Sequence, residues 1–232
     1  MTQTFFASLT RIADLDRNPF DYRPLDQSLW DSGDYVLSEV TGARSDLYVV
    51  ESRKGEMLPV KAGDRVIGAL GHREATLEGV GSYTDVLKGE MHAMTGAGLI
   101  GRFTSYSILL PDPLALLYRG HIVRDSAKIT MKQFAIDLDE GEFNIPTILI
   151  IGTSMSAGIT VTGRRVCEIL SQAGLNIVGV KLTGAGRYRD VGSFRRAGAQ
   201  TIFDFVDVGL PSTVVPEEEF REAIRPLLSH IG

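Results

Sequence analysis

Residues 147–160 constrain the fold of this 232-residue chain more than any other segment does. They read Thr-Ile-Leu-Ile-Ile-Gly-Thr-Ser-Met-Ser-Ala-Gly-Ile-Thr, an apolar, β-branched run followed by a loop between two glycines. The run predicts a buried strand over 147–151, and Pro146 suits the start of a strand because its missing N–H is not needed there. A helix is expected to begin near Thr160, so the segment predicts a strand, a glycine-bounded loop and a helix.

The loop between the two glycines has the chemistry of an anion site. Glycine lets the backbone turn its N–H groups toward a phosphate, and the following helix adds the positive end of its dipole. The candidate phosphate-binding residues of this segment are Gly152, Thr153, Ser154, Ser156, Ala157, Gly158, Ile159 and Thr160.

Strands and helices alternate after this loop. Apolar residues at helical spacing predict a helix over 163–173 that Gly174 ends. A second strand is expected over 176–182, a short helix with a basic face over 187–199 and a third strand over 201–206; a further helix over 216–230 follows. Alternation of this kind predicts an α/β unit with a parallel sheet.

These motifs make residues 147–232 resemble the P-loop domain of dethiobiotin synthetases and of molybdopterin-guanine dinucleotide biosynthesis B-type proteins and their relatives. The resemblance implies ATP or GTP as ligand with Mg²⁺, and chemistry that activates a small molecule. It implies that Thr160 supplies the hydroxyl that holds Mg²⁺, and that Lys181 faces the site from the end of the second strand and acts in catalysis. In that family a lysine follows the second glycine, whereas this chain has Ile159.

The isoleucine at this position leaves the function open. A lysine there acts as a point charge on the β- and γ-phosphates, and isoleucine cannot. Either another cation, such as Lys181, Arg164 or Arg187, takes its place, or the domain keeps the fold and binds phosphate weakly or not at all; a third interpretation is that the natural residue has been replaced. For catalysis, the sequence favours hydrolysis that is weak or lost.

Charged residues gather where the predicted strands end. Four arginines follow the second strand, and they indicate an anionic ligand at the mouth of the sheet or else the solvated side of a short helix: Arg187, Arg189, Arg195 and Arg196. Asp204 and Asp207 lie at the end of the third strand. Asp204 is a candidate Mg²⁺ ligand with Thr160, or it caps the turn.

The N-terminal part has a different pattern. Residues 1–136 predict a small β-rich domain, a barrel or sandwich, with an irregular arm and a short helix near residues 7–15; its strands are expected over 35–40, 47–52, 65–70 and 116–123, with a hairpin across Lys54-Gly55. Period-two spacing places Arg119 and His121 on one face of a strand. The G-x-G-x-x-G match at 96–101 is interpreted as a turn before a strand. The acidic residues 137–146 form a linker to the P-loop-like part, 147–232.

Composition bounds the remaining possibilities. The net charge of −5 argues against a general nucleic-acid binder. Neither a leader nor a membrane-length apolar run is found, so a cytoplasmic protein is expected. Scattered histidines favour no metal site, and Cys167 is expected in the core. Three predicted strands are few for a P-loop domain, so the chain is truncated or a natural short form, and an open sheet edge predicts a homodimer or larger oligomer.

Two functions of different classes follow. The first is a P-loop nucleotide-binding protein for ATP- or GTP-dependent activation of, or phosphoryl transfer to, a small molecule, with hydrolysis weak or lost. The alternative is a non-catalytic oligomeric binding or regulatory module that keeps the fold.

Overall fold

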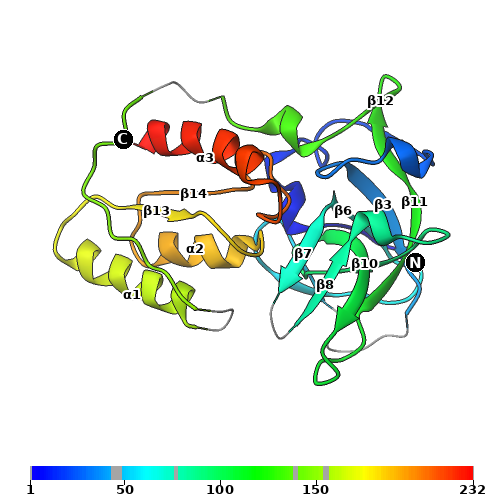
Figure 1. Cartoon of the computed structure of the whole chain (residues 1–232), viewed down its shortest axis with the longest axis horizontal. Helices are drawn as coiled ribbons and strands as arrows, with labels where there is room; N and C mark the ends of the chain where they lie inside the picture. The colour runs from blue at the N-terminus through cyan, green and yellow to red at the C-terminus, as the bar shows by residue number, and fades with distance from the viewer. Residues whose placement is uncertain (1, 43–48, 76–77, 138–140, 154–156, 232) are drawn as a thin grey trace.

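The structure is a computed structural model that describes residues 2–42, 49–75, 78–137, 141–153 and 157–231. It is mixed α/β. Figure 1 shows two parts side by side: a β-rich part from the N-terminal half of the chain, and an α/β part in which two strands lie between helices. Among the described helices, none has the length and apolar character needed to cross a membrane.

One large mixed sheet dominates the β-rich part. Its strands run in the order β1-β6-β3-β11-β9-β10-β8-β7, and an additional pairing of β6 with β10 makes β6, β3, β11, β9 and β10 a closed circuit. The β1–β6 and β10–β6 pairs are parallel and the other described pairs of this sheet are antiparallel. The strands are β1 (Thr4–Phe6), β2 (Asp21–Arg23), β3 (Tyr35–Val40), β6 (Arg65–Leu70), β7 (His72–Ala75), β8 (Gly79–Ser82), β9 (Glu90–Ala93), β10 (Leu99–Tyr106), β11 (Leu114–Arg124) and β12 (Ala127–Lys128).

The predicted hairpin across Lys54-Gly55 is confirmed. It joins β4 (Val49–Glu51) to β5 (Met57–Pro59) in an antiparallel pair, and Gly55 takes the left-handed conformation that the turn requires. The predicted strands 35–40 and 65–70 coincide with β3 and β6, while part of the predicted strand 47–52 lies outside the described residues. The match at 96–101 is a turn that leads into β10, as expected.

Short 3₁₀ helices connect the strands. The helix expected near residues 7–15 is the 3₁₀ helix η1 (Ser8–Ile12); the others described are η2 (Gln27–Leu29), η3 (Tyr83–Asp85) and η4 (Met131–Phe134). No side chain caps the start of η1, but Ala13 N–H closes its end by bonding to Thr10 O at 3.1 Å. Ser8, Leu9 and Thr10 are buried, so η1 is fixed between the two parts of the molecule.

The prediction that Arg119 and His121 share one face of a strand is wrong. The register of β11 against β3 shifts between Tyr118 and Gly120, and an irregularity of this kind breaks the two-residue alternation of side chains. Arg119 is therefore at the surface with Glu39, whereas His121 is fully buried and its Nδ1 lies 2.6 Å from the Tyr118 hydroxyl.

The α/β part follows the predicted order of elements after residue 157. It contains α1 (Ile159–Gln172), β13 (Val178–Lys181), α2 (Tyr188–Arg196), β14 (Thr201–Asp204) and α3 (Glu217–Ile231). The strands β13 and β14 are parallel, with Val178 opposite Thr201 and Lys181 opposite Asp204. In Figure 1, α3 lies on one side of this strand pair and α1 and α2 on the other. Gly174, with φ of 77°, follows the end of α1 as predicted.

The predicted buried strand over 147–151 is wrong. This segment has no strand pairing, and Ile148, Leu149 and Ile151 are 62%, 72% and 82% exposed. The apolar run indicates that burial of this segment would be favourable, but a buried strand also needs other elements packed on both of its faces. In the described residues, β13 pairs with β14 only, and Ile150 approaches α1 at Gly163.

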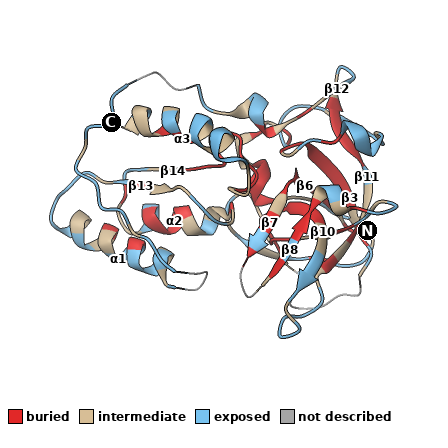
Figure 2. Cartoon of the chain, in the orientation of Figure 1, coloured by how far each residue is buried: buried red, intermediate tan, exposed pale blue. Residues whose placement is uncertain are grey.

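The two parts share a hydrophobic core. One cluster joins residues of the β-rich part, such as Leu9 and Tyr35, to Phe205 and Leu227 of the α/β part. A second cluster belongs to the strands of the closed circuit and includes Val36, Val66, Leu70, Met91, Ile100 and Leu116. Figure 2 shows the contrast between these buried strands and α1, whose surface is mostly exposed or half-buried. Cys167 is buried on α1, as expected.

Candidate functional site

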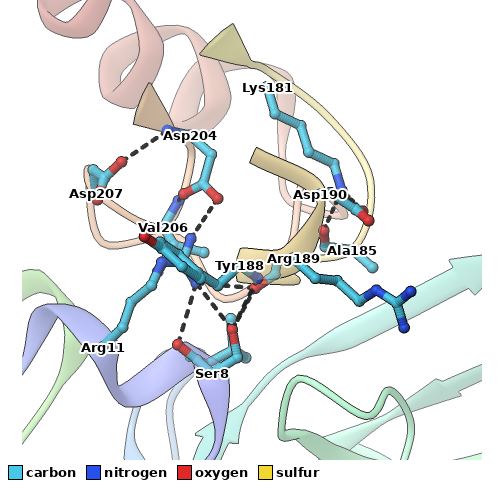
Figure 3. Close-up of polar contacts among 12 residues, drawn as sticks. Ser8, Arg11, Lys181, Ala185, Tyr188, Arg189, Asp190, Asp204, Val206 and Asp207 are labelled. Atoms are coloured by element: carbon cyan, nitrogen blue, oxygen red, sulfur yellow. Dashed lines mark hydrogen bonds and ion pairs between the residues drawn. The ribbon is translucent and has the colours of Figure 1, made fainter. Parts of the chain in front are cut away.

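The carboxyl ends of β13 and β14 meet the β-rich part at η1 (Figure 3). Open α/β sheets bind ligands at this edge, so the charged groups there are the first candidates for ligand binding. Lys181 is not free. Its Nζ donates to the Asp190 carboxylate at 2.5 Å and to the Ala185 carbonyl at 2.6 Å. The charge of Lys181, for which the resemblance implies a catalytic role, is therefore neutralised by a carboxylate from α2.

Asp204 is also engaged. Its side chain is fully buried and forms an ion pair with Arg11 of η1, whose side chain is only 9% exposed. Asp204 Oδ1 accepts the Val206 N–H at 2.9 Å, while Arg11 donates to the Gly186 carbonyl at 2.9 Å. These contacts make the carboxylate a structural anchor between the two parts.

Asp207 completes this group of charges. Its Oδ2 accepts the Asp204 N–H at 2.8 Å (Figure 3). Burial and the charge of Asp204 raise the pKa of Asp207 to about 6, and hydrogen bonding and Arg11 oppose this rise. Because two buried carboxyl groups lie close together and share a single arginine, protonation of one of them is favoured.

The first amides of α2 are satisfied by the β-rich part. The Tyr188 N–H bonds to Ser8 Oγ at 3.0 Å, and the Arg189 N–H bonds to Glu51 Oε1 at 3.1 Å. Glu51 is fully buried, and a carboxylate at this position complements the positive end of the helix dipole. The start of α2 is therefore an interface within the molecule rather than a place for a ligand.

The glycine-bounded segment lies at the start of α1. Gly158 takes the left-handed conformation, with φ of 83°, and α1 begins at Ile159 with no side chain as its cap. Gly152, Thr153 and Ala157 are exposed, and Thr160 is half-buried in the first turn; of the remaining predicted loop residues, Ser154 and Ser156 lie outside the described residues.

Ile159 folds back over the first glycine. A Cβ added at Gly152 would lie 2.8 Å from Ile159 Cδ1, so the backbone of the loop and this side chain are in close contact. The position at which the resemblance to P-loop proteins implies a cation is thus filled by an apolar group that is 40% exposed. Within the described ranges, no group of three or more His, Cys, Asp or Glu side chains could hold a metal ion.

Arg187 faces the β-rich part. It lies close enough to Arg73 of β7 to affect it: burial lowers the pKa of Arg73, Glu78 raises it, and Arg187 lowers it further. Arg73 forms an ion pair with Glu78. In the part of the chain that the structure describes, Arg187 Nε is buried and has no hydrogen-bond partner. Arg187 is therefore near the edge of the strand pair, as predicted, and it is close enough to another arginine, Arg73, to act on its charge.

A cleft of about 420 Å³ opens beside this edge, and four cationic residues line it. We call it the basic cleft; its cationic lining residues are Arg11, Arg53, Lys54 and Arg195. Sequence reasoning identified Arg195 and missed the other three, because they come from η1 and from the β4–β5 turn. The only sequence signal for them is the pair Arg53-Lys54 at a predicted turn.

Comparisons of the chain with protein-family models, with curated proteins and with solved structures found no match. Lys181 and Asp204 lie at strand ends, as predicted; the structure places them opposite each other on the paired strands β13 and β14 and gives each an internal partner of opposite charge. The site therefore offers backbone amides at the start of α1 and a separate set of side-chain cations in the basic cleft.

Proposed function

We propose that the chain is a nucleotide-binding protein of the P-loop type in which hydrolysis is weak or lost. The observation that carries the proposal is the start of α1. Among the described residues, Gly158 in its left-handed conformation leads directly into a 14-residue helix, and this glycine at the N-cap position supplies no side-chain cap. Uncapped amides at a helix start, after a glycine-bounded loop, favour the phosphates of ATP or GTP.

The weak or lost hydrolysis follows from one missing cation and from two side chains that are already engaged in ion pairs. Ile159 stands where a cation would neutralise the transferring phosphate, and it brings no charge. Lys181 is neutralised by Asp190, and Asp204 is neutralised by Arg11. Phosphoryl transfer needs positive charge aimed at the γ-phosphate, and releasing Lys181 for this role would leave Asp190 without its partner.

Titration calorimetry with Mg²⁺ and ATP, GTP or ADP tests the proposal. We expect the unaltered chain to bind weakly and Ile159→Lys to bind at least about tenfold more tightly, which is the effect of one charge-assisted hydrogen bond. Val161→Lys is the matched control, since Val161 is 64% exposed in the same turn and the change adds the same charge. Steady ATP hydrolysis by the unaltered chain, or no binding by either chain, would overturn the proposal.

A non-catalytic oligomeric module is the second candidate, and one observation favours it. The extended segment 147–151 exposes three large apolar side chains, Ile148, Leu149 and Ile151, and pairs with no described strand. Pairing with a second copy of the chain would cover this segment. Light scattering should then show a dimer that Leu149→Lys dissociates and that Ile108→Lys, at a 95% exposed position elsewhere, leaves intact. A monomer at high concentration would remove this candidate.

A further inference from the structure

The basic cleft collects cations from segments that are far apart in the chain. Arg11 comes from η1, Arg53 and Lys54 from the turn between β4 and β5, and Arg195 from α2. Asp207, just beyond β14, is the acidic residue in the lining. Cations brought together from three elements repel one another, so an arrangement of this kind needs nearby anions to offset the cost.

Among the described residues, two of the four cations have such an anion. Arg11 forms its ion pair with Asp204, and Arg53 forms one with Asp16. Across the described ranges, no acidic side chain forms an ion pair with Lys54 or Arg195, and both side chains belong to exposed residues. The cleft therefore has an excess of positive charge with two donors free to bind a ligand.

The same cleft has an apolar wall. Tyr188, together with isoleucine and valine side chains from η1, α2 and β14, lines it. The Arg11 guanidinium lies 5.9 Å from the centre of the Tyr188 ring, so this ring and this cation form one surface. A ligand of the cleft would meet both cations and an aromatic, aliphatic surface.

We propose that the basic cleft binds a small molecule that carries a diphosphate, or a similar pair of adjacent phosphates, joined to an apolar or aromatic group. Guanidinium groups present planar pairs of donors that match phosphate oxygens, and the lysine adds a point charge. A volume of about 420 Å³ is within the range of small-molecule sites. The site is separate from the glycine-bounded segment and shares no residue with it.

Occupation of the cleft ties the two parts of the molecule together. A diphosphate held by Lys54 and Arg195 connects the β4–β5 turn to α2, in addition to the Arg11–Asp204 pair that already joins η1 to β14. Ligands that bind only the folded state raise the unfolding temperature, by an amount that grows with their concentration relative to Kd. The ligand should therefore raise the melting temperature of the whole chain.

Calorimetry and thermal unfolding of the full chain with inorganic pyrophosphate, compared with inorganic phosphate, test the proposal. We expect pyrophosphate to bind more tightly, and the double variant Lys54→Gln, Arg195→Gln to weaken it by about 30-fold or more, because removing one charge-assisted hydrogen bond weakens binding by roughly tenfold. The matched control is Arg196→Gln, Arg225→Gln, which removes the same charge at exposed helix positions outside the cleft. The control should bind within about twofold of the unaltered chain.

Two results would overturn the proposal: no saturable pyrophosphate binding by the unaltered chain at millimolar concentrations, or equal weakening in the double variant and its control. Lys54→Arg keeps the charge and should keep the binding. Repeating the Mg·ATP titrations in the double variant separates this site from the one at α1. If Ile159→Lys still tightens Mg·ATP binding in the double variant, that tightening belongs to the α1 site. If it does not, the result counts against the proposed function alone and not against the basic cleft.

Discussion

Replacing Asp207 with asparagine should stabilise the protein at neutral pH. Burial and the neighbouring charge of Asp204 raise the pKa of Asp207 from 3.8 to about 6. Asparagine has nearly the same shape, and its side-chain oxygen can still accept the Asp204 N–H that Asp207 accepts at 2.8 Å. The change therefore removes the cost of the charge and keeps the hydrogen bond.

The size of the effect follows from the pKa. A difference of about two pH units between the pKa in the unfolded and folded states corresponds to at most about 3 kcal/mol, and we expect the substitution to recover about 2 kcal/mol. The sign is fixed because the folded pKa is the higher one. The contribution of protonated Asp207 to stability is complete below about pH 4 and is lost as the pH rises through about 6.

Urea denaturation at several pH values measures this effect. Asp207→Asn should unfold with a free energy about 2 kcal/mol higher than the unaltered chain at pH of about 7.5, and the difference should shrink toward zero near pH 4. Asp21→Asn, an exposed position in β2, should change little at any pH. A gain of equal size at both ends of the range, or a loss at neutral pH, would refute the reasoning.

Two further substitutions probe the packing between the parts. Arg11→Met should lower the free energy of unfolding by about 3 to 5 kcal/mol, since it leaves the buried Asp204 carboxylate unpaired; Arg17→Met, at a side chain 77% exposed, should cost less than about 0.5 kcal/mol by the same urea denaturation. Gly98→Ala should prevent folding or lower the free energy of unfolding by more than about 3 kcal/mol, because φ is +86° and the new Cβ would lie 2.2 Å from the Cβ of Ala7. Gly63→Ala, at a position with the same φ and open space around it, should lower it by about 1 kcal/mol. Equal losses within either pair would contradict these explanations.

Local pattern predicted most of the elements because it reports local preference. Alternating and β-branched runs gave β3 and β6 with their bounds, and the order α1, β13, α2, β14, α3 matches the predicted order after the glycine-bounded loop. The glycine that follows α1 was identifiable for the same reason, since only a residue tolerant of positive φ suits that position.

Contacts with other parts of the chain determine the features that the local sequence pattern did not predict. The run 147–151 is apolar enough for a buried strand, yet no described strand pairs with it. A single shift of register in β11 separated Arg119 from His121. Neither result follows from hydrophobicity along one segment, because both depend on which neighbours the rest of the chain supplies.

The sequence predicted only the part of the candidate site that lies at the strand ends. Lys181 and Asp204 were placed at the strand ends from the sequence, and the structure has them opposite each other. Their internal partners were not predictable. Arg11 lies 193 residues before Asp204, and no spacing rule relates them. The basic cleft was missed for the same reason, since its cations come from three separate elements.

Calorimetric titration of Ile159→Lys with Mg·ATP, beside the unaltered chain and Val161→Lys, tests the central claim most directly. The account predicts binding that tightens by at least about tenfold only when the lysine is at position 159, with weak or no hydrolysis by the unaltered chain. Equal affinities in all three chains would contradict it, because they would show that the start of α1 is not where the phosphates bind.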